Sequence, residues 1–137
     1  MAEDKELERI KEQMLKRLMT APDRGPWKDG EVLELSSSGF DGALAKTNLP
    51  VLVDFWAGWC SPCTMMRPAF EALAREYAGK VLFAKVDVDR NQELARRYGV
   101  MSIPNFILFK NGRPIERVVG AVGKIGLERA LETWKSP

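Results

Sequence analysis

The chain of 137 residues contains no histidine and only two cysteines. Histidine is the side chain whose ordinary pKa lies closest to neutral pH, and it is the commonest zinc ligand. Proton transfer near neutral pH is therefore left to a carboxylate, lysine, cysteine or tyrosine whose pKa is shifted by its surroundings. We expect neither a metal site nor a bound cofactor.

An excess of charge of one sign is missing, and so are long apolar runs. The chain carries 21 basic and 19 acidic residues, for a formal charge of +2. No stretch collects Lys and Arg alone, which disfavours a nucleic-acid binder. No apolar run approaches the roughly 20 residues that a membrane helix needs, and residues 1–20 are too densely charged for a signal peptide. We expect a cytoplasmic protein with neither nucleic-acid nor membrane partners.

The N-terminal segment is amphipathic. Residues 3–19 are expected to form a helix, because spacings of three and four place on one stripe its apolar side chains Leu7, Ile10, Met14 and Leu18. An isolated helix of about seventeen residues is marginal in water. The stripe must therefore be covered by its own domain, a second copy or another partner. We expect self-association or partner docking through residues 3–19.

Two prolines and two glycines between Ala21 and Gly30 indicate a linker. The predicted division is thus an N-terminal helix and linker over 1–30 and one domain over 31–137. In this domain, strands are expected at 32–35, 50–57, 81–88, 105–110 and 114–120. A first helix is expected to begin after the serines at 36–38, which would cap it, and to end at about Lys46. Further helices are expected at 60–77, 91–98 and 124–135. This alternation predicts an α/β fold whose first strands pair in parallel, and the hairpin formed by the last two strands adds an antiparallel edge.

The two cysteines, Cys60 and Cys63, stand between a buried strand and the start of a helix. Unpaired N–H groups at a helix start favour the thiolate, which is the nucleophilic form. We expect Cys60 to face solvent and attack, and Cys63 to be shielded and resolve. The alternatives are a structural disulfide, half of a zinc site, or two inert buried thiols. The first is disfavoured because so short a loop contributes only about 2 kcal/mol.

Two charged residues interrupt apolar runs. Asp54 lies within 51–56, where desolvation should raise its pKa, so it is the best candidate for accepting the Cys63 proton, directly or through water. Lys85 is similarly placed within 81–86. If the two strands are neighbours, the two charges can pair. The alternative for both is a purely structural ion pair.

The segment VDFWAGWCSPC at 53–63, with Ile103-Pro104 and the segment FKNG at 109–112, resembles the thioredoxin family. The resemblance extends over 32–134. It implies the thioredoxin fold, a central mixed sheet flanked by helices to which the N-terminal helix is an addition, and it implies dithiol–disulfide exchange. It also implies a cis peptide bond at Ile103–Pro104 beside the cysteines, which leaves the Ile103 backbone free to pair with an extended substrate.

The resemblance also indicates where a substrate would bind. Gly120 and Ala121 would form the wall opposite Pro104, and Trp59 would be an exposed contact surface. The expected substrate-binding residues are Trp59, Ser61, Pro62, Ile103, Pro104, Gly120 and Ala121. The chain departs from the family at Ser61, where Gly is usual, and at Asn105, where Thr is usual. The departure at Ser61 is expected to affect the reduction potential, and the departure at Asn105 is expected to affect partner preference.

The expected function is reduction of disulfides in protein substrates by the Cys60/Cys63 dithiol, which an unidentified reductase regenerates. Two alternatives stay open. The first is a binding module whose N-terminal helix docks a partner while redox activity is secondary. The second is a disulfide oxidase or isomerase.

Overall fold

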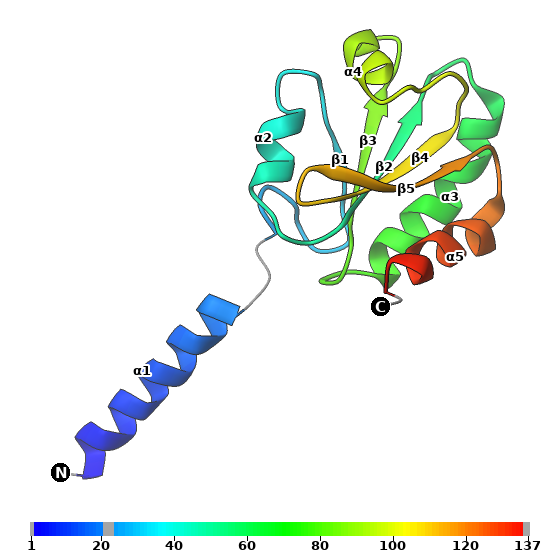
Figure 1. Ribbon diagram of the computed structural model, residues 1–137. Helices are drawn as coiled ribbons and strands as arrows, with labels where there is room; N and C mark the ends of the chain where they lie inside the picture. The colour runs from blue at the N-terminus through cyan, green and yellow to red at the C-terminus, as the bar shows by residue number, and fades with distance from the viewer. Residues whose placement is uncertain (1, 21–23, 136–137) are drawn as a thin grey trace.

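Five strands form one mixed sheet in the order β1-β3-β2-β4-β5 (Figure 1). The structure, a computed structural model, describes residues 2–20 and 24–135. The strands are β1 (Val32–Glu34), β2 (Val51–Trp56), β3 (Leu82–Asp87), β4 (Asn105–Lys110) and β5 (Arg113–Val119). β3 lies parallel between β1 and β2, whereas β4 is antiparallel to both β2 and β5. The predicted mixed sheet with a C-terminal hairpin is confirmed.

Helices cover both faces of the sheet. These helices are α2 (Phe40–Ala45), α3 (Ser61–Glu76), α4 (Gln92–Arg97) and α5 (Gly123–Lys135), whereas α1 (Ala2–Thr20) takes no part in the covering (Figure 1). Alternate residues of a strand point to opposite faces. Leu52 thus packs with Phe70 of α3 and Leu127 of α5, whereas Val53 packs with Phe40 of α2 and Leu94 of α4. The result is the thioredoxin fold, with β2 buried at its centre.

The serine cap expected for the first helix of the domain was wrong. α2 begins at Phe40 after Gly39, and no side chain caps it. Ser37 instead donates its backbone N–H and its hydroxyl to Asn91 Oδ1, at 2.8 and 3.2 Å. The serine segment therefore ties its loop to the start of α4, a contact between residues far apart in the sequence.

Trp27 lies in the segment predicted to be a linker, yet its side chain belongs to the core. It is 3% exposed, and its indole N–H donates to the Phe83 carbonyl at 2.9 Å. Arg24 forms an isolated antiparallel bridge with Thr47. A buried tryptophan contributes a large apolar area with one satisfied polar atom. The division at residue 30 stays a prediction, but a truncation that preserves this packing must keep Trp27.

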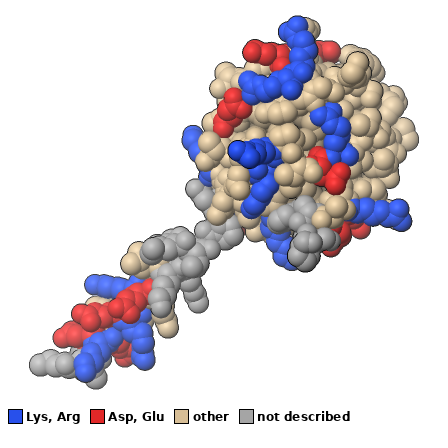
Figure 2. All heavy atoms as spheres, viewed as in Figure 1, with Lys and Arg blue, Asp and Glu red and all other residues tan. Residues whose placement is uncertain are grey.

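The N-terminal helix α1 stands apart from the sheet (Figure 1). Every side chain described in it, from Asp4 to Leu15, is exposed, including Leu7 at 52%, Ile10 at 46% and Met14 at 58%. The Leu18 side chain lies outside those that the structure describes. Acidic and basic side chains lie next to one another along α1 (Figure 2). Among the described helices, none is long and apolar enough to cross a membrane.

Candidate active site

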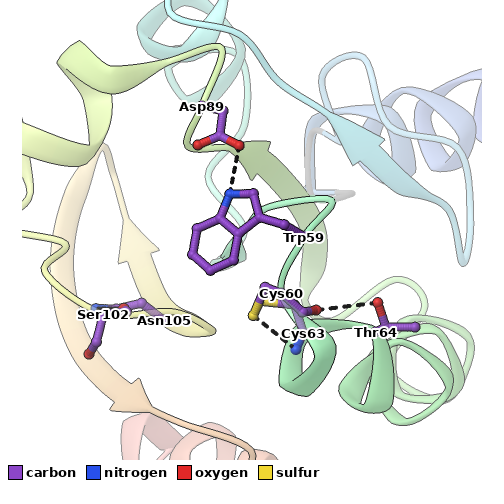
Figure 3. Close-up of a disulfide and its surroundings, with 7 residues drawn as sticks. All are labelled: Trp59, Cys60, Cys63, Thr64, Asp89, Ser102 and Asn105. Carbon is purple, nitrogen blue, oxygen red and sulfur yellow. Dashed lines mark hydrogen bonds between the residues drawn. A yellow bond between two sulfur atoms is a disulfide. The ribbon is translucent and has the colours of Figure 1, made fainter.

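Cys60 and Cys63 are joined by a disulfide at the start of α3, with their Cα atoms 5.3 Å apart (Figure 3). Cys60 is the N-cap of the helix, and its Sγ accepts the backbone N–H of Cys63 at 3.2 Å. Pro62 occupies the first turn, where a missing N–H costs no helical hydrogen bond. This position directs the positive end of the helix dipole at Cys60, which favours a thiolate there once the disulfide opens.

The expected difference in exposure between the two cysteines was wrong for the disulfide form. Both are 4% exposed, because Ala57 and the partly buried side chains of Trp56, Val88 and Ile103 pack around them. The difference lies in their surroundings instead. Cys60 caps the helix, whereas Cys63 lines a cavity of about 300 Å³.

Asp54 lines the same cavity as Cys63. It is 6% exposed, and its Oδ1 has no hydrogen-bond partner among the described residues. Desolvation raises the pKa of Asp54 from 3.8 to about 7, against the attraction of Lys85 and Arg67, which lowers it. The expected rise in pKa is confirmed. The carboxyl can therefore exchange a proton near neutral pH without a histidine.

Lys85 also lines this cavity, directly beside Asp54 in the parallel register of β2 and β3. Its close ion pair is not the one expected: the Lys85 ammonium lies 3.9 Å from Glu34 Oε2 and 5.2 Å from the centre of the Trp56 ring. Lys85 therefore acts on Asp54 from a distance, without a hydrogen bond. Its catalytic role stays a prediction.

Sequence reasoning missed Arg67. It lines the cavity, and its guanidinium carbon lies 5.9 Å from the centre of the Trp56 ring. A signal was available, since Arg67 follows Cys63 by four residues, and residues at that spacing share a helix face. Two cations thus approach the neighbourhood of Asp54, one from the sheet and one from α3.

The two segments expected to border an extended substrate, Ile103-Pro104 and Gly120-Ala121, lie next to each other. The Ile103–Pro104 peptide bond is cis, as the resemblance implied, and Pro104 is buried. The Gly120 N–H donates to the Pro104 carbonyl at 2.8 Å, which joins the two walls, and Ala121 beside it is exposed. Gly120 has φ +99°, a conformation that favours glycine, so the backbone itself requires this residue.

The remaining predicted contact residues surround the disulfide. Trp59 is 70% exposed, and its indole donates to Asp89 Oδ2 at 2.9 Å, which fixes the ring beside Cys60 (Figure 3). Ser61 and Pro62 are exposed. A second, mainly apolar cavity of about 350 Å³ is lined by Trp59, Val88, Val100, Met101, Ser102 and Ile103. An apolar surface thus adjoins the sulfur pair.

Asn105 occupies the position after the cis-proline. It is 2% exposed, and its side-chain N–H donates to the Ser102 carbonyl at 3.4 Å, across from the disulfide (Figure 3). Its Oδ1 is buried without a hydrogen-bond partner among the described residues. Asn105, which stands where the family usually has Thr, therefore supports the loop that carries Ser102. The same loop also lines the second cavity.

Comparison with known proteins agrees with this site. The family model for thioredoxin matches residues 31–133. A thioredoxin of Mycobacterium tuberculosis strain H37Rv is 48% identical over 99 residues, which cover 72% of this chain and 85% of the relative. Thioredoxin 1 of a Nostoc species is 42% identical over 99 residues, covering 72% of this chain and 92% of the relative.

A third relative is longer than the chain. A bifunctional thioredoxin reductase/thioredoxin of Mycobacterium leprae is 47% identical over 102 residues, which cover 74% of this chain but 22% of the relative. The sheet, the helix-capping Cys60 and these matches define a thiol–disulfide oxidoreductase. The chain belongs to the thioredoxin family.

Proposed function

We propose that the chain reduces disulfides of protein substrates. The observation that carries this proposal is the placement of Cys63 and Asp54 on one cavity, with the pKa of Asp54 raised by burial to about 7. A carboxyl of that pKa can take the Cys63 proton at neutral pH, which releases the resolving thiolate. The exposed apolar surface at Trp59 supports docking of a protein beside the sulfurs.

The reaction has two sulfur-exchange steps. The Cys60 thiolate attacks one sulfur of the substrate disulfide, so a mixed disulfide forms and the other substrate sulfur leaves as a thiolate. Cys63 then gives its proton to Asp54 and attacks the Cys60 sulfur, which releases the second substrate thiolate. Two electrons pass to the substrate, and the Cys60–Cys63 disulfide remains.

A donor must return those two electrons. The Mycobacterium leprae relative is named as both a thioredoxin reductase and a thioredoxin, which supports a thioredoxin reductase as the donor here. The cytoplasmic location expected from the sequence stays a prediction.

Reduction of insulin by dithiothreitol tests the activity. The full chain should accelerate precipitation of the reduced insulin chains, because Cys60 attacks the insulin disulfides faster than the small dithiol does. Cys60→Ser is the matched control and should give only the uncatalysed rate. Equal rates with the wild-type chain, the variant and no protein would contradict the proposal.

A second proposal concerns α1, whose apolar side chains Leu7, Ile10 and Met14 are exposed. We infer that its partner is a second copy of the chain, paired antiparallel. The sequence places Glu3, Asp4, Glu6 and Glu8 at the start of the helix and Lys16 and Arg17 near its end. Antiparallel pairing brings each acidic start beside a basic end, and it covers both apolar stripes.

Sedimentation of a chain lacking residues 1–20 tests this pairing. The full chain should sediment as a dimer and the truncated chain as a monomer with the same insulin-reduction rate, because Trp27 and the domain core are retained. Ile10→Glu should also give a monomer, whereas Gln13→Glu, another exposed position of α1, should not. A monomeric full chain would exclude a second copy as the partner, and loss of reduction on truncation would place α1 within the catalytic domain.

A further inference from the structure

Several charged side chains line the cavity beside Cys63, although the transfer of the Cys63 proton requires only Asp54. Besides Asp54, its lining includes Lys85 from β3 and, from α3, Arg67, Glu71 and Arg75. Glu34 of β1 pairs with Lys85 at 3.9 Å. Two of the cations, Lys85 and Arg67, lower the pKa of Asp54. The carboxyl thus experiences a balance between desolvation and two separate positive charges.

Trp56 holds both cations near the carboxyl. Asp54 and Trp56 are two residues apart on β2, so their side chains lie on the same face of the sheet. The Trp56 ring has the Lys85 ammonium 5.2 Å and the Arg67 guanidinium carbon 5.9 Å from its centre. Cations at these distances are attracted by the face of an aromatic ring. The ring therefore restrains both charges without neutralising either.

The two cations are not equivalent. Lys85 has a carboxylate partner, Glu34, whereas no ion pair of Arg67 is found among the described residues. Arg67 is also on the helix that carries Cys63, one turn further along. Its charge therefore acts on Asp54 from the helix that carries Cys63. A guanidinium keeps its charge at every pH at which the thiols react.

This inference rests on the proposed function. We propose that Arg67 is a positioning residue for the resolving step: together with Lys85, it increases the fraction of Asp54 that is ionised at neutral pH and can accept the proton of Cys63. In this proposal Arg67 acts through Asp54 and takes no part in the sulfur exchange itself. Its removal should leave the attack by Cys60 unchanged and should shift the resolving step to higher pH, because more of Asp54 is then protonated at pH 7.

Stopped-flow reaction of the reduced protein with dithiobis(nitrobenzoate) separates the two steps. Attack by Cys60 releases the first thionitrobenzoate, and attack by Cys63 on the mixed disulfide releases the second. For Arg67→Gln, the pH midpoint of the second phase should rise by about half a unit, which makes that phase about three-fold slower below the midpoint. The first phase should keep its rate.

Three further variants isolate the electrostatic role. Arg67→Lys should restore the wild-type midpoint, because it keeps the charge. Arg75→Gln, on the same helix and cavity, should leave the midpoint unchanged, since Arg75 is not among the groups that shift Asp54. Arg67→Gln added to Asp54→Asn should cause no further shift, because its target is gone.

An unchanged midpoint in Arg67→Gln would overturn the inference, as would an equal shift in the Asp54→Asn background. Carbon-13 titration of the Asp54 carboxyl in the folded protein gives the same comparison without any substrate. A chain that fails to reduce insulin would contradict the proposed function, while this titration would still decide the role of Arg67.

Discussion

Cys63→Ser is expected to accumulate mixed disulfides between Cys60 and its protein substrates, whereas Cys60→Ser accumulates none. The helix start favours the thiolate of Cys60, so the first attack survives the loss of Cys63. Without Cys63 no thiolate remains to release the substrate, and the intermediate persists. Both variants should lose insulin reduction completely, because each removes one of the two sulfurs that form the final disulfide.

Non-reducing electrophoresis after mixing each variant with oxidised insulin shows the trapped species directly. Treatment with dithiothreitol should release it, which separates a disulfide from other adducts. Equal trapping by the two variants would contradict the assignment of attacking and resolving sulfurs. Trapping by Cys60→Ser alone would reverse it.

Asp54→Asn is expected to stabilise the folded protein at neutral and alkaline pH while slowing the resolving step. The pKa of Asp54 is raised from 3.8 in the unfolded reference to about 7 in the fold. Ionised Asp54 therefore destabilises the fold by up to the order of 4 kcal/mol, at about 1.4 kcal/mol per pKa unit. Asparagine has similar shape and no charge to desolvate.

The sign of the pH dependence follows from the raised pKa. Below about pH 4, Asp54 is protonated in both the folded and the unfolded state, so its ionisation does not lower the stability of the wild type. As the pH rises through about 7, the wild type loses stability relative to Asp54→Asn. Chemical denaturation of the oxidised proteins at pH 4 and pH 8 measures this difference. Glu31→Gln, at an exposed position, is the control for loss of one negative charge. A stability difference that is independent of pH would contradict an ionisable, desolvated Asp54.

The kinetic half of this prediction is separate. Asp54→Asn should reduce disulfides more slowly than the wild type between pH 6 and 8, because Cys63 loses its proton acceptor. An unchanged rate over that range would leave Asp54 as a structural carboxyl.

Local sequence pattern was sufficient for the elements that position the site. The uniformly apolar run around Asp54 predicts a strand buried on both faces, and the position of the cysteines after this strand predicts that they lie at the start of a helix. The cis bond at Pro104 came from the family resemblance, since no local pattern distinguishes it from an ordinary strand-entry proline. These features depend on short stretches of chain or on a recognised motif.

What the sequence missed depends on contacts between distant segments. Ser37 has the chemistry of a helix cap but bonds to Asn91, because the folded loop brings that amide within 2.8 Å. Trp27 lies among prolines and glycines, and its burial and its bond to Phe83 show only in the fold that it belongs to the core. Arg67 is an exposed residue of α3, and only the fold shows that it lies beside Trp56 and lines the cavity of Asp54. In each case the partner, rather than the residue, determines the role.

The reduction potential of the Cys60/Cys63 pair tests the central claim most directly, because a reductant and an oxidase share the same sulfur chemistry and differ in the favoured redox state. Equilibration of the protein with glutathione buffers of known composition, followed by alkylation of free thiols, gives that potential. A disulfide reductase should have a potential below about −230 mV, near the −270 mV or so known for thioredoxins. A potential of about −180 mV or higher, the range of isomerases and strong oxidants, would contradict the account.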